Sequence, residues 1–168
     1  MASKGLACCV CVLATLLVAA AAVAGTFGYL YYFGASAVPG LVFKKSPHTA
    51  RRTIDRVAEE VTRRRLAILG NVSHTANADS VNLPLRPTEL LIVGNPRAGT
   101  PLMQSAQTAG IDLPQKFLAY TDEDGQTWLT YNLPNYLKWR HHINDRDNVL
   151  ENIGNALDQI TDKAIEEE

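Results

Sequence analysis

The sequence has no cysteine beyond residue 11, which limits the chemistry open to most of the chain. Cys8, Cys9 and Cys11 all lie in an apolar run near the start. The rest of the chain therefore offers no disulfide, no thiolate metal site and no cysteine nucleophile. We expect the three cysteines to pack against lipid, with acylation as an alternative.

Charge is also missing from the first forty residues. No charged residue lies between Lys4 and Lys44, and no acidic residue precedes Asp55. Residues 6–33 exceed the roughly 20 apolar residues that cross a bilayer, and aromatic residues gather at their far end, as is typical of a membrane interface. We predict a short tail at 1–5, a transmembrane helix at 6–33 embedded in the lipid bilayer, a linker at 34–47 and a domain at 48–168.

The orientation of this predicted anchor follows from the lysines and arginines that flank it. Lys4 stands alone before the run, whereas several basic residues follow it, beginning with Lys44 and Lys45. The positive-inside rule then places the domain on the cytoplasmic, matrix or stromal side, and a mitochondrion is compatible with the acid-poor start. The alternative is a signal peptide cleaved after Ala22-Val23-Ala24, which gives a secreted domain with a glycosylation sequon at Asn71.

The near-neutral total charge hides a basic segment followed by an acidic one. Residues 34–65 hold eight Lys/Arg and three Asp/Glu, whereas residues 66–168 hold seven and fourteen. A basic collar beside a membrane is suited to anionic lipid head groups, and a solvated helix face is the alternative. Nucleic acid is not an expected partner, because no aromatic residues interleave with the arginines.

The pattern of apolar residues predicts alternating helices and strands. Helical spacing of apolar residues, β-rich runs and Gly/Pro punctuation provide the evidence. An Asp-Gly turn between two β-rich runs indicates a hairpin, and its acidic residues fit an exposed turn better than a cation site. The predicted elements are a helix at 49–61, strands at 66–73 and 90–93, a loop with helical turns at 74–80, an extended segment at 83–87, a helix at 101–109, a hairpin at 115–132, a helix from Pro134, and a last amphipathic helix through 149–164 before a solvated tail.

The segment from Leu90 to Met103 is the centre of the predicted domain, and it reads as strand, turn and helix. Four consecutive apolar residues favour a strand covered on both faces, and Gly94, Asn95 and Pro96 favour a tight turn. Thr100 before Pro101 is typical of a helix start. Free N–H groups there, beside Arg97, suggest an anion site, with a plain turn as the alternative. The glycine spacing matches neither a dinucleotide fingerprint nor a P-loop.

Several motifs together resemble the DUF302 family over about residues 48–162. They are His74–Ala78, Leu85–Met103 with its Gly-Asn-Pro-x-x-Gly-Thr core, Asp112–Lys116, Trp128–Asn132 and Tyr136–His141. The resemblance implies a small two-layer α+β domain, with an antiparallel-rich sheet and helices packed on it, often self-associating. It implies no reaction. The chain departs from the family at Asn77, where glycine is common, and in the predicted anchor, which many relatives lack.

Eight polar residues in these motifs are the candidates for binding a ligand. They are His74, Asn95, Arg97, Thr100, Lys116, Tyr131, Asn132 and His141. Neither a Ser-His-Asp order nor an H-E-x-x-H pattern is present, and we expect no metal and no cofactor.

These features favour a membrane-anchored, non-catalytic module. Within that class it is either a small-ligand or anion-binding domain, or an accessory subunit of a membrane protein complex, and it acts with other subunits or as a homodimer. The alternatives are an enzyme that uses His74 and Lys116, and a secreted binding protein.

Overall fold

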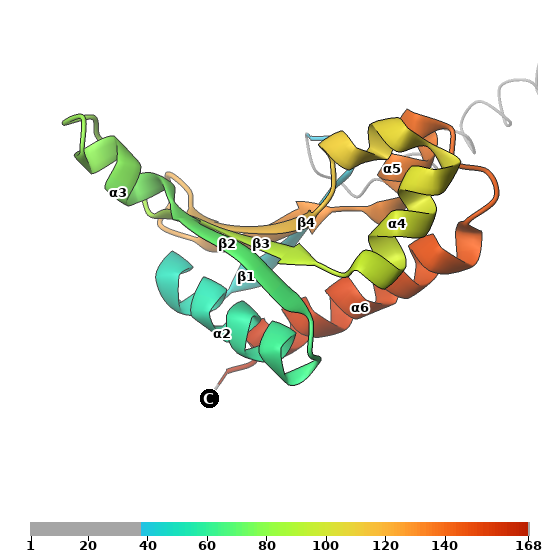
Figure 1. The fold of residues 1–168 in the computed structure, drawn as a ribbon. Coiled ribbons are helices and arrows are strands. Elements are labelled where there is room, and N and C mark those ends of the chain that lie inside the picture. The colour runs from blue at the N-terminus through green and yellow to red at the C-terminus, as the bar shows by residue number, and fades with distance from the viewer. Residues whose placement is uncertain (1–37, 168) are drawn as a thin grey trace, which may run out of the picture. The chain divides into compact units, whose positions relative to one another are not determined.

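The computed structural model describes residues 38–167, which contain a five-stranded sheet and its helices (Figure 1). The predicted tail at 1–5 and the predicted transmembrane helix at 6–33 lie outside the described residues. Within residues 38–167, no helix combines the length and the apolar character needed to cross a membrane.

The described elements alternate between strand and helix along the chain. In order they are β1 (Leu41–Ser46), α2 (Ala50–Arg63), β2 (Ala67–Ser73), α3 (His74–Asp79), β3 (Thr88–Gly94), α4 (Pro96–Ser105), the 3-10 helix η1 (Gln107–Ile111), β4 (Gln115–Thr121), β5 (Thr127–Asn132), α5 (Pro134–His141) and α6 (Asp147–Ile165).

The sheet has the strand order β1-β5-β4-β3-β2, and every neighbouring pair is antiparallel. β4 is the middle strand, and β1 and β2 are the edges. Helices α2 and α6 pack on one face, where Ile54 and Ile160 meet Phe117 and Leu129 in the main core. The α+β class and the antiparallel sheet predicted from the sequence are therefore confirmed.

Strand β3 shows that helices from the described residues, 38–167, cover one face of the sheet and leave its other face partly exposed. Its residues alternate strictly between partly exposed and buried, with Glu89, Leu91 and Val93 turned toward the helices. The prediction that both faces of this strand are covered was wrong, because an unbroken apolar run does not reveal which residues face solvent.

Strand β1 corrects the predicted linker at 34–47. Residues 41–46 pair with β5 along their whole length, from Leu41 opposite Asn132 to Ser46 opposite Thr127. The buried Ser46 hydroxyl also lies 2.7 Å from that of Thr53 on α2. The strand is hard to predict from the sequence, because Lys44 and Lys45 interrupt its apolar pattern.

Helix α4 begins at Pro96, five residues earlier than the predicted start at Pro101. The Asn95 side chain accepts a hydrogen bond from the Arg97 N–H at 3.1 Å, and Pro96 occupies the first helical position. Pro101 then lies inside the helix, which ends at Ser105, and Gln107–Ile111, which includes Gly110, forms η1. The sequence offers two capping residues that are each followed by proline, Asn95-Pro96 and Thr100-Pro101. The prediction was wrong because the first of these pairs, and not the second, starts the helix.

Candidate ligand-binding site

A cavity of about 560 Å³ lies between the sheet and the lobe built from α4 and η1. The described residues form two separate hydrophobic clusters. One joins the sheet to α2 and α6, and the other gathers Leu102, Ala109, Ile143 and Leu150. Ile153 of α6 packs against both clusters. The cavity occupies the space where the two clusters do not merge.

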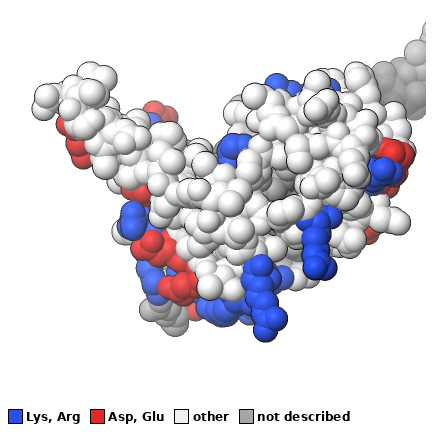
Figure 2. All heavy atoms as spheres, viewed as in Figure 1, with Lys and Arg blue, Asp and Glu red and all other residues white. Residues whose placement is uncertain are grey.

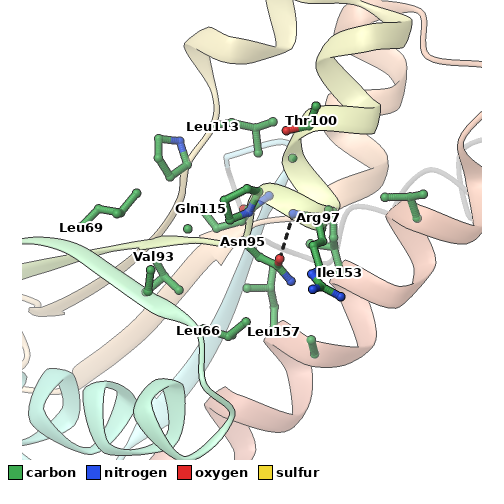
Figure 3. A pocket seen from close by; sticks show the side chains of 18 of the residues that line it. Leu66, Leu69, Val93, Asn95, Arg97, Thr100, Leu113, Gln115, Ile153 and Leu157 are labelled. Carbon is green, nitrogen blue, oxygen red and sulfur yellow. Dashed lines mark hydrogen bonds between the residues drawn. The ribbon is translucent and has the colours of Figure 1, made fainter.

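The lining of the cavity is largely apolar and comes from distant parts of the chain (Figure 3). Helix α6 contributes one helical stripe, β2 and β3 contribute their adjacent ends, and α4 contributes its first turns. The apolar lining residues include Leu66, Leu69, Val93, Leu113, Phe117, Val149, Ile153, Ala156, Leu157 and Ile160. Arg97 carries the only charge among the described lining residues.

The first turns of α4 bring three of the predicted site residues to the cavity: Asn95, Arg97 and Thr100. All three are exposed as whole residues, so they form a polar rim. Thr100 lies inside the helix and not at its start, so the free N–H groups expected at Thr100 are not there. The anion site predicted at Thr100 therefore lacks its helix terminus.

Gln115 places an unpaired amide in the wall of the cavity. Its position on β4 puts it on the same face as Phe117, and its side chain is one of those lining the cavity (Figure 3). Both polar atoms of its amide are buried and have no hydrogen-bond partner among the described residues. An unsatisfied buried amide costs about 1–3 kcal/mol, so a ligand that pairs with it gains that amount back.

A β-bulge at Leu69 shapes the edge of the cavity. The β2–β3 register runs from Ile68 opposite Val93 to Gly70 opposite Ile92, which leaves Leu69 as the extra residue. The Leu69 side chain lies 2.7 Å from where a Cβ on Gly94 would stand. A Cβ at position 94 would therefore displace the end of the Leu69 side chain, which is exposed and can move aside.

Tyr131 and Asn132 lie away from the cavity, near the β1 edge. The Tyr131 hydroxyl is 3.5 Å from Asp158 Oδ1, and burial together with the Asp158 charge raises the pKa of the phenol above its usual value. Asn132 is paired with Leu41 at the end of β5. The Tyr131 ring also packs against Phe117, with 6.0 Å between the two ring centroids. These contacts give Tyr131 a structural role in the core.

His74 and Lys116 are not brought together. Ser73, just before His74, pairs with Glu89, whereas Lys116 pairs with Ile92, about 10 Å further along β3 and on its other side. Lys116 Nζ donates to the carbonyl oxygens of Asp112 and Pro114 at 3.0 and 2.9 Å. Lys116 thus holds the turn before β4.

His141 belongs to a polar cluster behind the cavity wall. Its Nε2 lies 2.6 Å from Asp112 Oδ2, its Nδ1 lies 3.0 Å from the Thr108 hydroxyl, and Arg140 donates to Asp112 Oδ1 at 3.1 Å. These contacts tie α5 to η1 and to the start of the segment that carries Leu113 and Gln115. His141 thus supports the cavity wall without lining the cavity.

Comparison with known families agrees with this architecture. The model of DUF302, a domain of unknown function, matches residues 42–160. The chain belongs to the DUF302 family. The match begins in β1 and ends in α6, so it includes the sheet and every element that lines the cavity.

Relatives of two kinds are similar to this chain. A crystal structure of an uncharacterized conserved DUF302 protein from Bacillus stearothermophilus superposes with a TM-score of 0.67 at 20% identity, covering 74% of this chain and 98% of that one. Proteins named fluoride-specific ion channel FluC 1 from Brucella suis and FluC 2 from Brucella melitensis are 44% identical over 104 residues, or 62% of this chain. The chain spans about two-fifths of the length of these Brucella proteins, 41% and 38% respectively.

The main residues that sequence reasoning missed are Gln115 and the apolar stripe of α6. Gln115 stands within the quoted Asp112–Lys116 motif, and its signal was a polar residue in phase with Phe117 and Ala119 on an inward face. The apolar stripe of α6 is predicted from its sequence. The sequence does not show that the stripe is longer than the part covered by the sheet and continues to the second cluster.

Proposed function

We propose that this protein is a membrane-anchored, non-catalytic module whose DUF302 domain binds a small, largely apolar molecule in the cavity beneath α4. The observation that carries the proposal is the cavity itself. Its volume of about 560 Å³ falls in the range of small-molecule sites, and such sites combine apolar walls with a few polar groups.

The polar groups of the cavity indicate the character of the ligand. Arg97 gives the rim a positive charge, and Gln115 offers an NH2 donor group and a carbonyl acceptor in the wall. Pairing with Gln115 requires a rotation of its side chain, because both amide atoms are buried. A molecule with an apolar body and one neutral or anionic polar head fits this lining best.

We propose a non-catalytic module because the titratable side chains predicted for the site do not meet in the cavity. His74, Lys116 and His141 each have local partners or positions outside the cavity, and Arg97 is the one titratable side chain among the described lining residues. Proton transfer requires an acid or base within hydrogen-bond reach of the substrate. A guanidinium, which stays protonated, is suited to binding and not to proton transfer.

The membrane half of the proposal rests on the apolar run at 6–33 and on the Brucella relatives. Those relatives carry a homologous stretch within proteins named as ion channels, and an ion channel acts in a membrane. This supports an accessory role for the domain beside a membrane. We do not extend fluoride conduction to this chain, because the chain spans only about two-fifths of the length of those proteins.

A ligand-binding titration tests the cavity. The full chain in lipid nanodiscs is titrated with the fluorophore aminoanthracene, an apolar ring with one amino group, and empty nanodiscs provide the blank. Ala156→Leu fills part of the cavity, so we expect its dissociation constant to rise about tenfold, which corresponds to about 1.4 kcal/mol. Asn155→Leu, next to it on α6 but exposed and outside the lining, should bind like the wild type. Equal affinity in the wild type and Ala156→Leu, or no binding above the blank, would overturn the proposal.

A further inference from the structure

Helix α5 presents an aromatic surface to the outside of the domain. Trp139 is 68% exposed, although tryptophan is on average a highly buried residue. Leu137 of the same helix is buried, and two positions along a helix correspond to about 200° around its axis, so Trp139 points away from the core. The Tyr136 ring packs beside Trp139, with 5.8 Å between the two ring centroids.

The short helix η1 adds an exposed apolar side chain next to α5. Arg140 of α5 donates to Asp112 Oδ1 at 3.1 Å, which links α5 to the end of η1. Ile111, the residue before Asp112, is 73% exposed. Ile111, Tyr136 and Trp139 together are called the α5 surface below.

The α5 surface lies where the chain enters the compact domain. The Leu133 N–H, just before α5, donates to the carbonyl oxygen of Gly40 at 2.8 Å. A Cβ on Gly40 would stand 2.4 Å from the Tyr136 ring, so the Gly40 backbone lies directly against that ring. Gly40 is the first residue of the compact unit, and the predicted transmembrane helix ends at residue 33. The chain between residues 33 and 40 spans at most about 25 Å, which limits the distance between a bilayer and Gly40.

We propose that the α5 surface docks on the interfacial region of the lipid bilayer, with Trp139 inserted among the lipid head groups. This inference rests on the proposed membrane anchor and adds a second contact, which the folded domain makes itself. Tryptophan and tyrosine concentrate at membrane–water interfaces, because each has an apolar ring and a polar group that pairs with water or head groups. The short tether keeps the α5 surface near the bilayer.

The arginines of α2, which the sequence suggests for contacts with head groups, are paired within the domain. Arg51 contacts Asp55 at 3.3 Å and Arg63 contacts Glu60 at 2.9 Å. Figure 2 shows basic and acidic side chains interspersed over α2. Helix α2 also follows the far end of β1, and six residues of strand extend about 20 Å from Leu41. The α5 surface therefore lies closer than α2 to the point where the chain enters the domain.

The charges of α5 favour a contact made by aromatic insertion and not by ionic attraction. Lys138 Nζ contacts Asp147 at 2.6 Å, and Arg140 contacts Asp112 at 3.1 Å, so carboxylates of the domain already accompany both cations. We therefore expect the contact to form on neutral phosphatidylcholine. We also expect it to persist at about 1 M salt, which screens exposed charges beyond about 3 Å.

Tryptophan quenching tests the docking, because the chain has two tryptophans, Trp128 and Trp139. The full chain is placed in phosphatidylcholine nanodiscs with or without bromine on the upper acyl chains, which quenches tryptophan at short range. In Trp128→Phe, where Trp139 remains, brominated lipid should lower the emission at least about twofold. In Trp139→Phe, where Trp128 remains opposite Lys45 on the sheet, the emission should change little. The difference between the wild type and Trp139→Phe measures Trp139 without replacing Trp128.

The possible outcomes separate this inference from the proposed anchor. A chain that co-elutes with nanodiscs while Trp139 stays unquenched, or while both tryptophans are quenched equally, would overturn docking through α5 and leave the anchor standing. Shielding of Trp139 from acrylamide without quenching by lipid would overturn it in favour of a protein partner. A chain that does not co-elute with nanodiscs would overturn the anchor and this inference together.

Discussion

At the scale of single residues, Asp122 shows how one carboxylate organises the β4–β5 hairpin. Its Oδ2 accepts a hydrogen bond from Trp128 Nε1 at 2.6 Å, and its Oδ1 accepts from the backbone N–H groups of Asp124 and Gln126 at 3.0 and 2.9 Å. These bonds stabilise the ionised form. The Trp128 bond, followed by the backbone bonds, lowers the pKa of Asp122 below its usual value.

The lowered pKa of Asp122 predicts a pH-dependent contribution to stability. A group whose pKa is lower in the folded state contributes stability that is present above its unfolded pKa, about 3.9, and is lost as pH falls through the folded value. We expect the wild type to have a higher urea midpoint than Asp122→Asn at pH 6, and the gap to close as pH falls below about 4.

The neighbouring carboxylate provides the control for Asp122. Glu123→Gln changes an exposed side chain in the same turn, which has no hydrogen bond to the described residues, so its gap to the wild type should stay small at every pH. A gap for Asp122→Asn that does not change between pH 6 and pH 3 would show that the hydrogen bonds do not favour the ionised form.

At the scale of elements, the two ends of the sheet differ in what holds them. The β2 edge carries a bulge and exposed Ile68 and Leu69. The β1 edge is tied to α6, because Lys44 Nζ contacts the carboxylates of both Asp158 and Asp162. β1 also covers one side of β5, and without it the backbone groups of β5 would lack partners.

This dependence on β1 predicts where the domain can be truncated. A chain of residues 38–168 retains β1, whereas a chain of 48–168, which starts at the boundary expected from sequence, loses it. We expect 38–168 to unfold cooperatively on heating, and 48–168 to lose this transition or to aggregate, because it exposes β5 and removes the buried Ser46–Thr53 contact. Circular dichroism melts compare the two, and equal melting temperatures would show that β1 is dispensable.

At the scale of the whole molecule, the chain combines an apolar start with a domain that has its own core. Residues 40–168 form one compact unit. The DUF302 protein from Bacillus stearothermophilus is matched over 98% of its length and covers 74% of this chain. The family model matches residues 42–160, so the apolar start lies outside the matched part of the chain.

The proposed anchor predicts how the whole chain fractionates. Full-length protein should remain with the membrane pellet after alkaline carbonate extraction, whereas 38–168 should be released, because about 20 or more apolar residues insert stably into a bilayer. Intact mass measurement of the recovered protein provides the check. A soluble chain that begins at Gly25 would replace the anchor with a cleaved signal peptide.

The sequence by itself determined most elements of the fold, because local signals fix them. Thr49 caps α2 at 3.3 Å from the Arg52 nitrogen, Asp-Gly closes the hairpin, and Pro134 starts α5. The family and three rim residues of the cavity, Asn95, Arg97 and Thr100, could also be predicted from the sequence, because the three residues lie within one contiguous motif of the family.

Only the tertiary structure decided the rest. Whether β1 joins the sheet depends on β5, almost ninety residues away, and whether Asn95 or Thr100 caps α4 depends on how β3 ends. The cavity arises because the α6 stripe reaches past the sheet to a second cluster, and this leaves the Gln115 amide unpaired between them. Such features depend on contacts between distant segments, and local patterns in a sequence do not record them.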